Sequence, residues 1–284
     1  KDLTLTPTVF DKDILMSVGE YRQLNKKSKI LADIGFVDGF KSSNTNEKGS
    51  LSHLFLEYNK NLEFENYISS DLELSLEKVS NDKYLKIFDP HITKSEVRPA
   101  NFDKLNSSLK MFLDHEKFNF ETGIESYENL QISNKSDKFQ YILPYYNFNK
   151  SIPQDNIKGN FNFNSNGSNN LSDTNVIKSN IINNLYFNSY DYISNLGLKS
   201  NYGFNLQNLN SSGKKNSLYK SSPQIELAGL FNVDLSLPLA KDTEKYENSL
   251  IPKLSFRFNP SDMKNYSTSR NKIDVNNIFA LNRL

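Results

Sequence analysis

The chain has 284 residues, of which 24% are charged and 37% hydrophobic, and its formal net charge is +1. Because positive and negative residues nearly balance, composition gives no electrostatic reason to expect a nucleic-acid partner. The chain has no cysteine, which excludes disulfides and thiolate metal sites within it. No apolar run approaches the ~20 residues that a membrane-spanning helix needs. The mean hydropathy of −0.62 does not exclude a membrane protein, since a barrel strand is apolar only at alternate residues.

Alternation of apolar and polar residues dominates the sequence and predicts β-strands. In 68–77, for example, Leu72 and Leu74 alternate with Asp71 and Glu73. A helix would scatter these residues around its circumference, whereas a strand sorts them onto two faces. The same pattern predicts about fourteen strands and no substantial helix. In chain order, these strands are 3–10, 14–23, 28–37, 51–60, 68–77, 107–114, 117–126, 138–148, 157–164, 181–193, 196–207, 224–239, 247–259 and 273–284.

Strand and connector lengths favour a membrane barrel. Most of the predicted strands are about as long as the ~9–11 residues of a tilted membrane strand, whereas soluble strands usually run about 5–6. Short connectors alternate with longer polar ones, as in an up-and-down barrel. The longer connectors comprise 38–50, 80–106, 127–137, 165–180, 210–220 and 260–272. Of these, 80–106, 165–180, 210–220 and 260–272 are expected to emerge at one rim, on the extracellular side. A soluble antiparallel protein, with a dry face and a wet face, would also alternate and remains the alternative.

The polar faces of the predicted strands carry the candidate binding residues. A charged side chain on the lipid face of a barrel costs up to about 2–4 kcal/mol, so in a barrel these faces must point into the lumen. In a soluble protein they would simply be solvated. The candidate lumen-facing residues are Asp71, Glu73, Glu77, Lys199, Asn201, Gln207, Glu226, Asp234, Lys253 and Arg257.

Nothing in the sequence points to catalysis or to a bound metal. His53, His91 and His115 stand apart, with no partner at the spacing of metal ligands. No phosphate-binding or dinucleotide-binding glycine motif is present, nor is a nucleophile-elbow serine motif. We therefore expect no catalytic residue, no metal site and no cofactor.

Several segments match, in order and approximate spacing, a known family. They are DLTLTPT at 2–8, GEYR at 19–22, KVSNDKYL at 78–85 running into Phe88-Asp89, IPKL at 251–254, FNP at 258–260 and NIFALNR at 277–283. Together they resemble the LptD family, also called organic solvent tolerance proteins OstA, which assembles lipopolysaccharide in the outer membrane of Gram-negative bacteria. No single segment is specific; their order carries the resemblance.

The resemblance implies a fold and a domain organisation. Residues 1–284 would be part of a single outer-membrane barrel domain, an internal portion without the periplasmic N-terminal domain and the closing strands. The expected fold is all-β, an antiparallel up-and-down transmembrane β-barrel, incomplete and open at both ends.

The resemblance also implies a function without catalysis. Lipopolysaccharide sugars would pass through a polar lumen and its lipid tails through a lateral seam. The expected partners are lipopolysaccharide, a plug lipoprotein of the LptE type inside the barrel, the periplasmic Lpt bridge and the barrel-assembly machinery. Another outer-membrane barrel, such as a porin or a nutrient transporter, and a soluble β-rich binding protein are the alternatives.

Pro7 is the candidate gate residue. It falls within the first predicted strand, where members of the resembled family carry a proline beside the lateral opening. Proline cannot donate a backbone hydrogen bond, so it weakens a strand ladder. Pro7 would thus be part of the lateral gate, unless it is merely a tolerated edge or bulge proline. Pro238 and Pro252 lie far from the expected seam and are predicted to be bulges.

Overall fold

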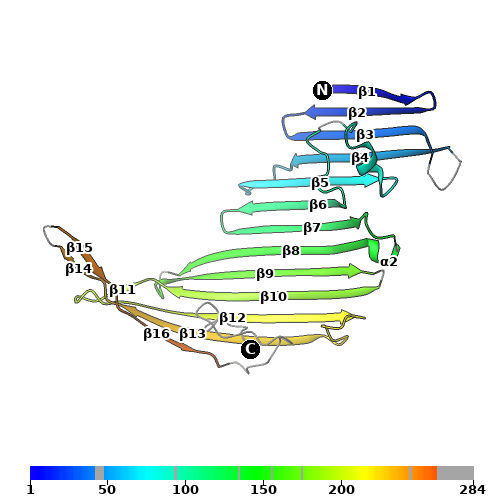
Figure 1. Cartoon of the computed structure of the whole chain (residues 1–284). Coiled ribbons are helices and arrows are strands. Elements are labelled where there is room, and N and C mark those ends of the chain that lie inside the picture. The colour runs from blue at the N-terminus through cyan, green and yellow to red at the C-terminus, as the bar shows by residue number, and fades with distance from the viewer. Residues whose placement is uncertain are drawn as a thin grey trace. The chain divides into compact units, whose positions relative to one another are not determined.

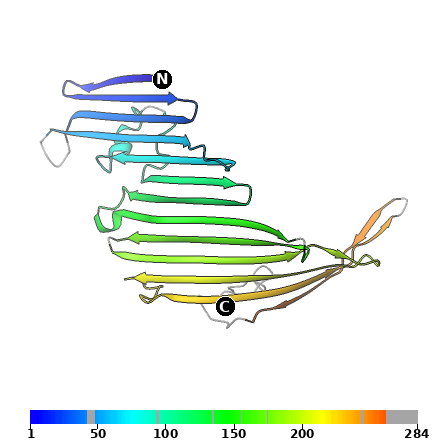
Figure 2. The same cartoon turned by 180° about the vertical axis from the view of Figure 1, so that it is seen from behind.

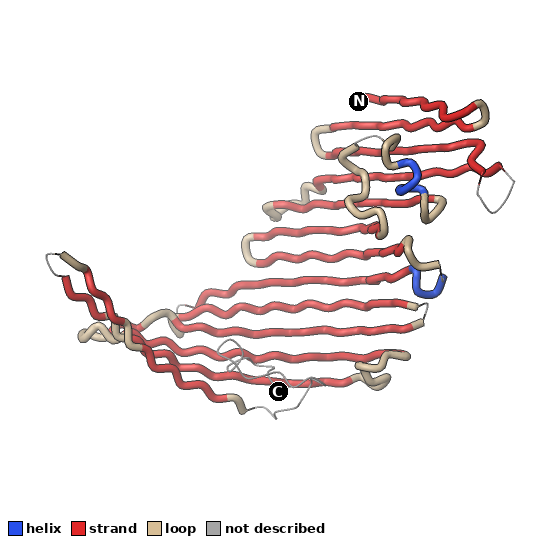
Figure 3. Tube along the Cα trace, viewed as in Figure 1, coloured by secondary structure: helices blue, strands red, loops and turns tan. Residues whose placement is uncertain are grey.

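The computed structural model describes residues 1–41, 48–92, 95–133, 135–154, 156–173, 175–242 and 245–260. These residues form an all-β structure with two short helices, α1 (Tyr84–Phe88) and α2 (Lys135–Lys138), drawn in blue in Figure 3. In the described ranges, no helix has the length and apolar character to cross a membrane. The strands are β1 (Asp2–Asp11), β2 (Ile14–Leu24), β3 (Ser28–Lys41), β4 (Lys48–Asn61), β5 (Ser69–Val79), β6 (Lys104–His115), β7 (Phe118–Asn129), β8 (Phe139–Gln154), β9 (Gly159–Ser172), β10 (Val176–Ser189), β11 (Tyr192–Ile193), β12 (Lys199–Lys214), β13 (Gln224–Ser236), β14 (Leu239–Asp242), β15 (Glu247–Leu250) and β16 (Lys253–Phe258).

The strands follow one another in space as they do in sequence (Figure 1). The main sheet has fourteen strands in the order β1 to β10, then β12, β13 and β16, with β11 paired to β12. β14 and β15 form a separate two-stranded sheet. This order confirms the predicted antiparallel, up-and-down, all-β arrangement. The chain divides into two compact units: the first comprises Lys1–Tyr146, Ser168–Ser179 and Gly213–Ser221, and the second comprises Asn147–Gly167, Asn180–Ser212 and Ser222–Leu284.

In the first unit, antiparallel pairing from β1 to β7 sorts side chains onto two faces. Cross-strand partners share a face, because successive side chains of a strand point to opposite sides. The register places Asp33, Glu57, Glu73 and Glu125 on the same side of the sheet, which we call the polar face. The opposite apolar face includes Leu5, Ile34, Leu54, Leu74 and Leu109.

Part of the polar face is covered by the connector between β5 and β6. Figures 1 and 2, which view the strands from opposite sides, place this segment on one face of β3 to β5. We call residues 80–103 the strap; its positions 93 and 94 lie outside the described residues. Its apolar side chains pack on those of the strands to form the core, which comprises Met16, Val18, Leu31, Val37, Leu51, Phe55, Val79, Tyr84, Leu85, Phe88, Ile92, Val97, Leu105 and Leu130. The long connector therefore folds back over the sheet instead of projecting from a rim.

In the second unit, two prolines end strands that the sequence pattern predicted as continuous. The predicted strand 224–239 is β13, which stops at Ser236, followed by β14, which starts at Leu239. The predicted strand 247–259 is likewise divided into β15 and β16. Pro238 and Pro252 lie in these two interruptions, and the Leu237 amide donates to the Pro252 carbonyl at 3.1 Å. The prediction that both prolines are bulges is wrong: they mark the point where the β14–β15 ribbon leaves the main sheet.

Parts of two predicted polar connectors are strands in the structure. Most of 165–180 is strand, because β9 runs to Ser172 and β10 starts at Val176. The connector predicted at 210–220 begins later, since β12 extends to Lys214. Polar Asn- and Ser-rich sequence is thus compatible with strand where both neighbours supply backbone partners. The connector 260–272, apart from Pro260, and the strand 273–284 lie outside the described residues.

Gly39 gives a direct test of the packing between β3 and the β1–β2 turn. Its φ is +77°, and a Cβ at this position would lie 1.8 Å from the backbone oxygen of Asp13. We expect Gly39→Ala to lower the free energy of unfolding by about 1–3 kcal/mol, because strain and a backbone clash coincide. Gly49→Ala, on the neighbouring strand, is the control, since a Cβ there would lie 3.9 Å from the Phe40 backbone oxygen, an ordinary contact. Urea unfolding of both purified variants measures the difference; equal stabilities would contradict this packing.

Candidate functional site

In the first unit, the sequence-predicted residues Asp71, Glu73 and Glu77 all lie on the polar face of β5. Their cross-strand partners on β4 are Asn61, Asn59 and Phe55, respectively. Asp71 accepts a hydrogen bond from the Asn61 amide at 3.2 Å, and Glu77 accepts one from the Asn106 backbone amide at 2.6 Å.

The polar face continues as a charged network onto β6 and β7. Lys110 lies opposite Glu73 and forms an ion pair with Glu125 at 2.9 Å. Tyr127 donates to the same Glu125, and Tyr145 donates to Glu121 at 2.8 Å. The face thus presents carboxylates, an ammonium group and phenol hydroxyls side by side, which is a surface that can exchange hydrogen bonds with a polar solute.

In the second unit, the remaining predicted residues also share one face. The β12–β13 register puts Asn201 opposite Asp234, and the β13–β16 register puts Arg257 opposite Asn232. By alternation along the same three strands, this face carries Lys199, Asn201, Gln207, Glu226, Asp234, Lys253 and Arg257. All seven are therefore brought to one side of the sheet, as the sequence pattern predicted.

A hollow of about 370 Å³ lies among these residues. It is lined by Asn201, Asp234, Leu235, Ser236, Lys253, Ser255 and Arg257. Asp234 accepts hydrogen bonds from Ser255 at 2.5 Å and from Asn232 at 2.8 Å. Nearby, Asn201 donates to Asp191 at 3.1 Å. The hollow combines two cationic side chains with hydroxyl and amide groups, a set suited to sugars and anionic groups.

The apolar faces of both units are exposed. Leu5 retains 71% of its accessible surface in the first unit, and Leu227 retains 71% and Phe256 65% in the second. Soluble proteins rarely leave large contiguous apolar surfaces open to water. These faces therefore call for an apolar environment.

Pro7 lies on the apolar face of β1, between Leu5 and Val9. It pairs with Ser17 of β2, and it is exposed. Within the described ranges, β1 is the first strand of the sheet order and β2 is its paired neighbour. The sequence-predicted gate proline is thus in a strand that stands at one end of the order.

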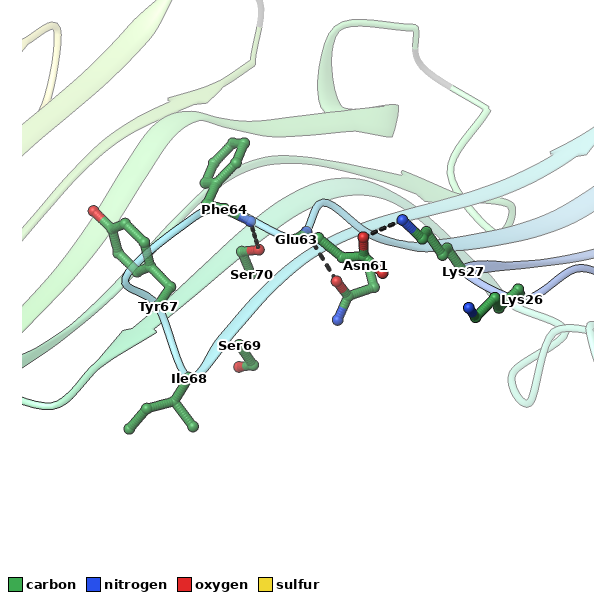
Figure 4. A pocket seen from close by; sticks show the side chains of 9 residues that line it. All are labelled: Lys26, Lys27, Asn61, Glu63, Phe64, Tyr67, Ile68, Ser69 and Ser70. Atoms are coloured by element: carbon green, nitrogen blue, oxygen red, sulfur yellow. Dashed lines mark hydrogen bonds and ion pairs between the residues drawn. The ribbon is translucent and has the colours of Figure 1, made fainter.

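A further hollow, of about 440 Å³, is formed by two turns (Figure 4). It lies between the β2–β3 and β4–β5 turns, and Lys27 forms an ion pair there with Glu63. The Glu63 amide donates to Asn61 at 2.9 Å, and the Phe64 amide donates to Ser70 at 3.0 Å. These contacts shape the turn and include none of the predicted site residues.

A buried cluster that the sequence does not predict joins the strap to the sheet. His53 Nε2 lies 3.0 Å from Asp33 Oδ1, and His53 Nδ1 lies 2.8 Å from the Tyr84 hydroxyl. The side chains of Asp33 and His53 have no exposed surface, and Tyr84 is also fully buried. Burial, reinforced by the Asp33 charge, raises the pKa of the Tyr84 hydroxyl. The consistent assignment has Nε2–H donating to Asp33 and the Tyr84 hydroxyl donating to Nδ1.

This cluster corrects the expectation that His53 stands apart. The three residues come from β3, β4 and the strap, so sequence spacing does not reveal their contact. The signal nearest to it is Gly35, which lies opposite His53: a Cβ there would be 2.2 Å from the imidazole and 2.9 Å from the Tyr84 oxygen. Among the described residues, no group of three or more His, Asp or Glu side chains could hold a metal ion.

Removing the Tyr84 hydroxyl should destabilise the first unit. In Tyr84→Phe, His53 Nδ1 loses its donor in a fully buried site, which costs about 1–3 kcal/mol. Tyr127→Phe is the matched control, because its hydroxyl donates to Glu125 on the same face but is only half-buried. Thermal unfolding of the purified protein should show a clearly lower midpoint for Tyr84→Phe than for Tyr127→Phe. Equal midpoints would mean that the cluster does not hold the strap.

Comparison with known proteins assigns the chain to a family. The family model LptD, described as LPS transport system D, matches residues 52–284, which includes most of β4 and every later element but not β1 to β3. A search of curated proteins finds no match. The family is a transport component and not an enzyme, and lipopolysaccharide is what it transports. The chain belongs to the LptD family of outer-membrane lipopolysaccharide-transport proteins.

Proposed function

We propose that this chain forms part of the wall of an outer-membrane barrel that delivers lipopolysaccharide to the outer leaflet. The sugars pass along the polar face, and the lipid tails leave through a lateral seam bordered by β1. The observation that carries the proposal is the sorting of side chains: in both units, the predicted lumen residues share one face, and most of the large exposed apolar residues share the other.

Lipid is the environment that the apolar faces fit. A charge there would cost up to about 2–4 kcal/mol at mid-membrane, whereas Leu74, Leu227 and Phe231 belong in hydrocarbon. The polar faces then line the lumen. They include all ten predicted residues, from Asp71 on β5 to Arg257 on β16.

A polar lumen lets a sugar chain move without a large penalty. The sugar hydroxyls give up hydrogen bonds to water and form hydrogen bonds of similar strength to the carboxylates, amides and ammonium groups of the lumen. The hollow beside Lys253 and Arg257 adds positive charge, which favours anionic groups carried on the sugars. Because positive and negative charges are mixed on the rest of the face, each single contact with the sugar stays weak, and the sugar chain can pass.

The seam follows from the chemistry of a strand ladder. Lipid tails can leave sideways only where two neighbouring strands part, which breaks the backbone hydrogen bonds between them. Pro7 supplies no donor, so the ladder at β1 has one bond fewer to break. β1 is therefore one border of the proposed lateral gate, with Pro7 as its weak point.

The partners of this proposal come from the family. A plug lipoprotein of the LptE type would occupy the lumen, the periplasmic Lpt bridge would deliver lipopolysaccharide, and the barrel-assembly machinery would insert the protein. The family match favours this function over a porin, a nutrient transporter or a soluble binding protein.

Pro7→Ala in the full-length protein tests the gate. Alanine restores a backbone donor, and a net hydrogen bond contributes about 0.5–1.5 kcal/mol, so the seam should open several-fold less often. We expect normal protein abundance, less lipopolysaccharide at the cell surface and greater sensitivity to large hydrophobic antibiotics. Pro153→Ala, in β8, is the control for a strand proline away from the seam. Unchanged lipopolysaccharide export in a properly folded Pro7→Ala protein would show that Pro7 is only a tolerated strand proline.

A further inference from the structure

The strap contacts β1, the strand that borders the proposed seam. The Phe10 ring lies 4.5 Å from the His91 ring at an interplanar angle of 86°, and 5.9 Å from the Phe88 ring at 62°. Both are edge-to-face arrangements, the geometry that aromatic rings favour. By alternation with Thr8, Phe10 projects from the polar face, on which the strap lies. Residues about eighty positions apart in sequence thus meet at the end of β1.

Phe10 lies where the ladder between β1 and β2 is irregular. The register shifts between Val9 and Asp11, just before the β1–β2 turn. A bulge disrupts the ladder locally, so the β1–β2 pairing gives this end of β1 little support. The ring contacts from the strap supply support from a different direction, across the face of the sheet.

The strap itself is firmly attached. Its Phe88 packs against Phe40 of β3 at 6.1 Å, and its Tyr84 bonds to His53 of β4. Tyr84 and Phe88 also contact each other, at 5.1 Å between ring centroids. A continuous row of aromatic contacts therefore leads from β1 to β4, through Phe10, Phe88, Tyr84, His53 and Phe55. Strands β3 and β4 thus support β1 through the strap, independently of β2.

We propose that the strap is a positioning element for the gate: His91 and Phe88 hold Phe10 and keep this end of β1 on the sheet, so that opening is confined to the part of the strand around Pro7. Phe10 and Pro7 are three residues apart, which corresponds to roughly 10 Å along a strand. The weak point and the supported end are thus adjacent. This inference rests on the proposed function for the role of β1, whereas the contact with Phe10 stands independently of it.

The rings make the support testable without reference to transport. An aromatic pair contributes about 0.5–1.5 kcal/mol beyond its buried area. Loss of the Phe10–His91 contact should therefore accelerate local opening of β1 by about two- to twelve-fold. Local opening is measured by the hydrogen exchange of backbone amides.

The variants are His91→Ala, Phe10→Ala and their combination, made in the full-length protein in lipid. His91 is exposed and outside the strands, so its replacement spares the core. His91→Phe retains a ring and should keep exchange in residues 2–11 slow. His115→Ala is the matched control, because His115 stacks on Phe118 at 4.8 Å at the β6–β7 turn.

We expect faster exchange in β1 for both single variants, with no further gain in the combination, and unchanged exchange in β6 and β7. His115→Ala should accelerate β6 and β7 and leave β1 unchanged. The support of β1 by the strap is overturned by unchanged β1 exchange in His91→Ala, by additive effects in the combination, or by equal acceleration of β1 in His115→Ala.

A second readout separates this inference from the proposed function. When the end of β1 is released in His91→Ala, the seam should leak. Cells with this variant should become more sensitive to large antibiotics at normal protein abundance. Faster β1 exchange without any leak, in cells where Pro7→Ala does reduce export, would overturn the gating role of the strap and leave the proposed function standing. No effect of either variant on export or permeability would instead refute β1 as a border of the seam.

Discussion

The backbone ladder between neighbouring strands is the interaction on which the rest of this structure depends. Once two strands are paired, each side chain is assigned to a face, and a slip of one residue would move every side chain to the other side. Here such a slip on β5 would turn Leu72, Leu74 and Leu76 to the face now held by Asp71 and Glu73. The cost of charges in an apolar environment makes that register unfavourable, so the sequence pattern and the ladder specify each other.

The polar face is not uniform, and the strap explains why. Near the β1–β2 turn, it carries Met16, Val18, Phe55 and Val79, all buried under strap residues. Farther along β4 and β5 it carries Glu57 and Glu73, and on β6 and β7 it carries the ion pair of Lys110 with Glu125. One face thus provides a dry support for β1 at one end and a wet, charged surface at the other. The buried Asp33–His53–Tyr84 cluster lies at the boundary, where His53 bonds to both the Asp33 carboxylate and the Tyr84 hydroxyl.

The sequence predicted what depends on local alternation and missed what depends on distant contacts. The strands of the first unit, the two faces and the grouping of Lys199, Asn201 and Asp234 all follow from a period of two. The sequence does not predict the division at Pro238 and Pro252, because a proline can mark either a bulge or a strand end. The Asn- and Ser-rich residues 165–180 predict a connector, since Asn and Ser favour turns, but in the structure neighbouring strands override that preference. The strap and the partners of His53 have no periodic signal, because they arise where residues remote in sequence meet.

The accessibility of the two faces in a membrane tests the account most directly. Nitroxide labels would be attached to single cysteines at Leu74 and Glu73 in the first unit, and at Leu227 and Glu226 in the second, in the full-length protein in lipid bilayers. The account predicts that labels at Leu74 and Leu227 collide with oxygen, which concentrates in hydrocarbon, and that labels at Glu73 and Glu226 collide with a water-soluble nickel complex. Water accessibility at Leu74 and Leu227, or lipid accessibility at Glu73 and Glu226, would contradict it.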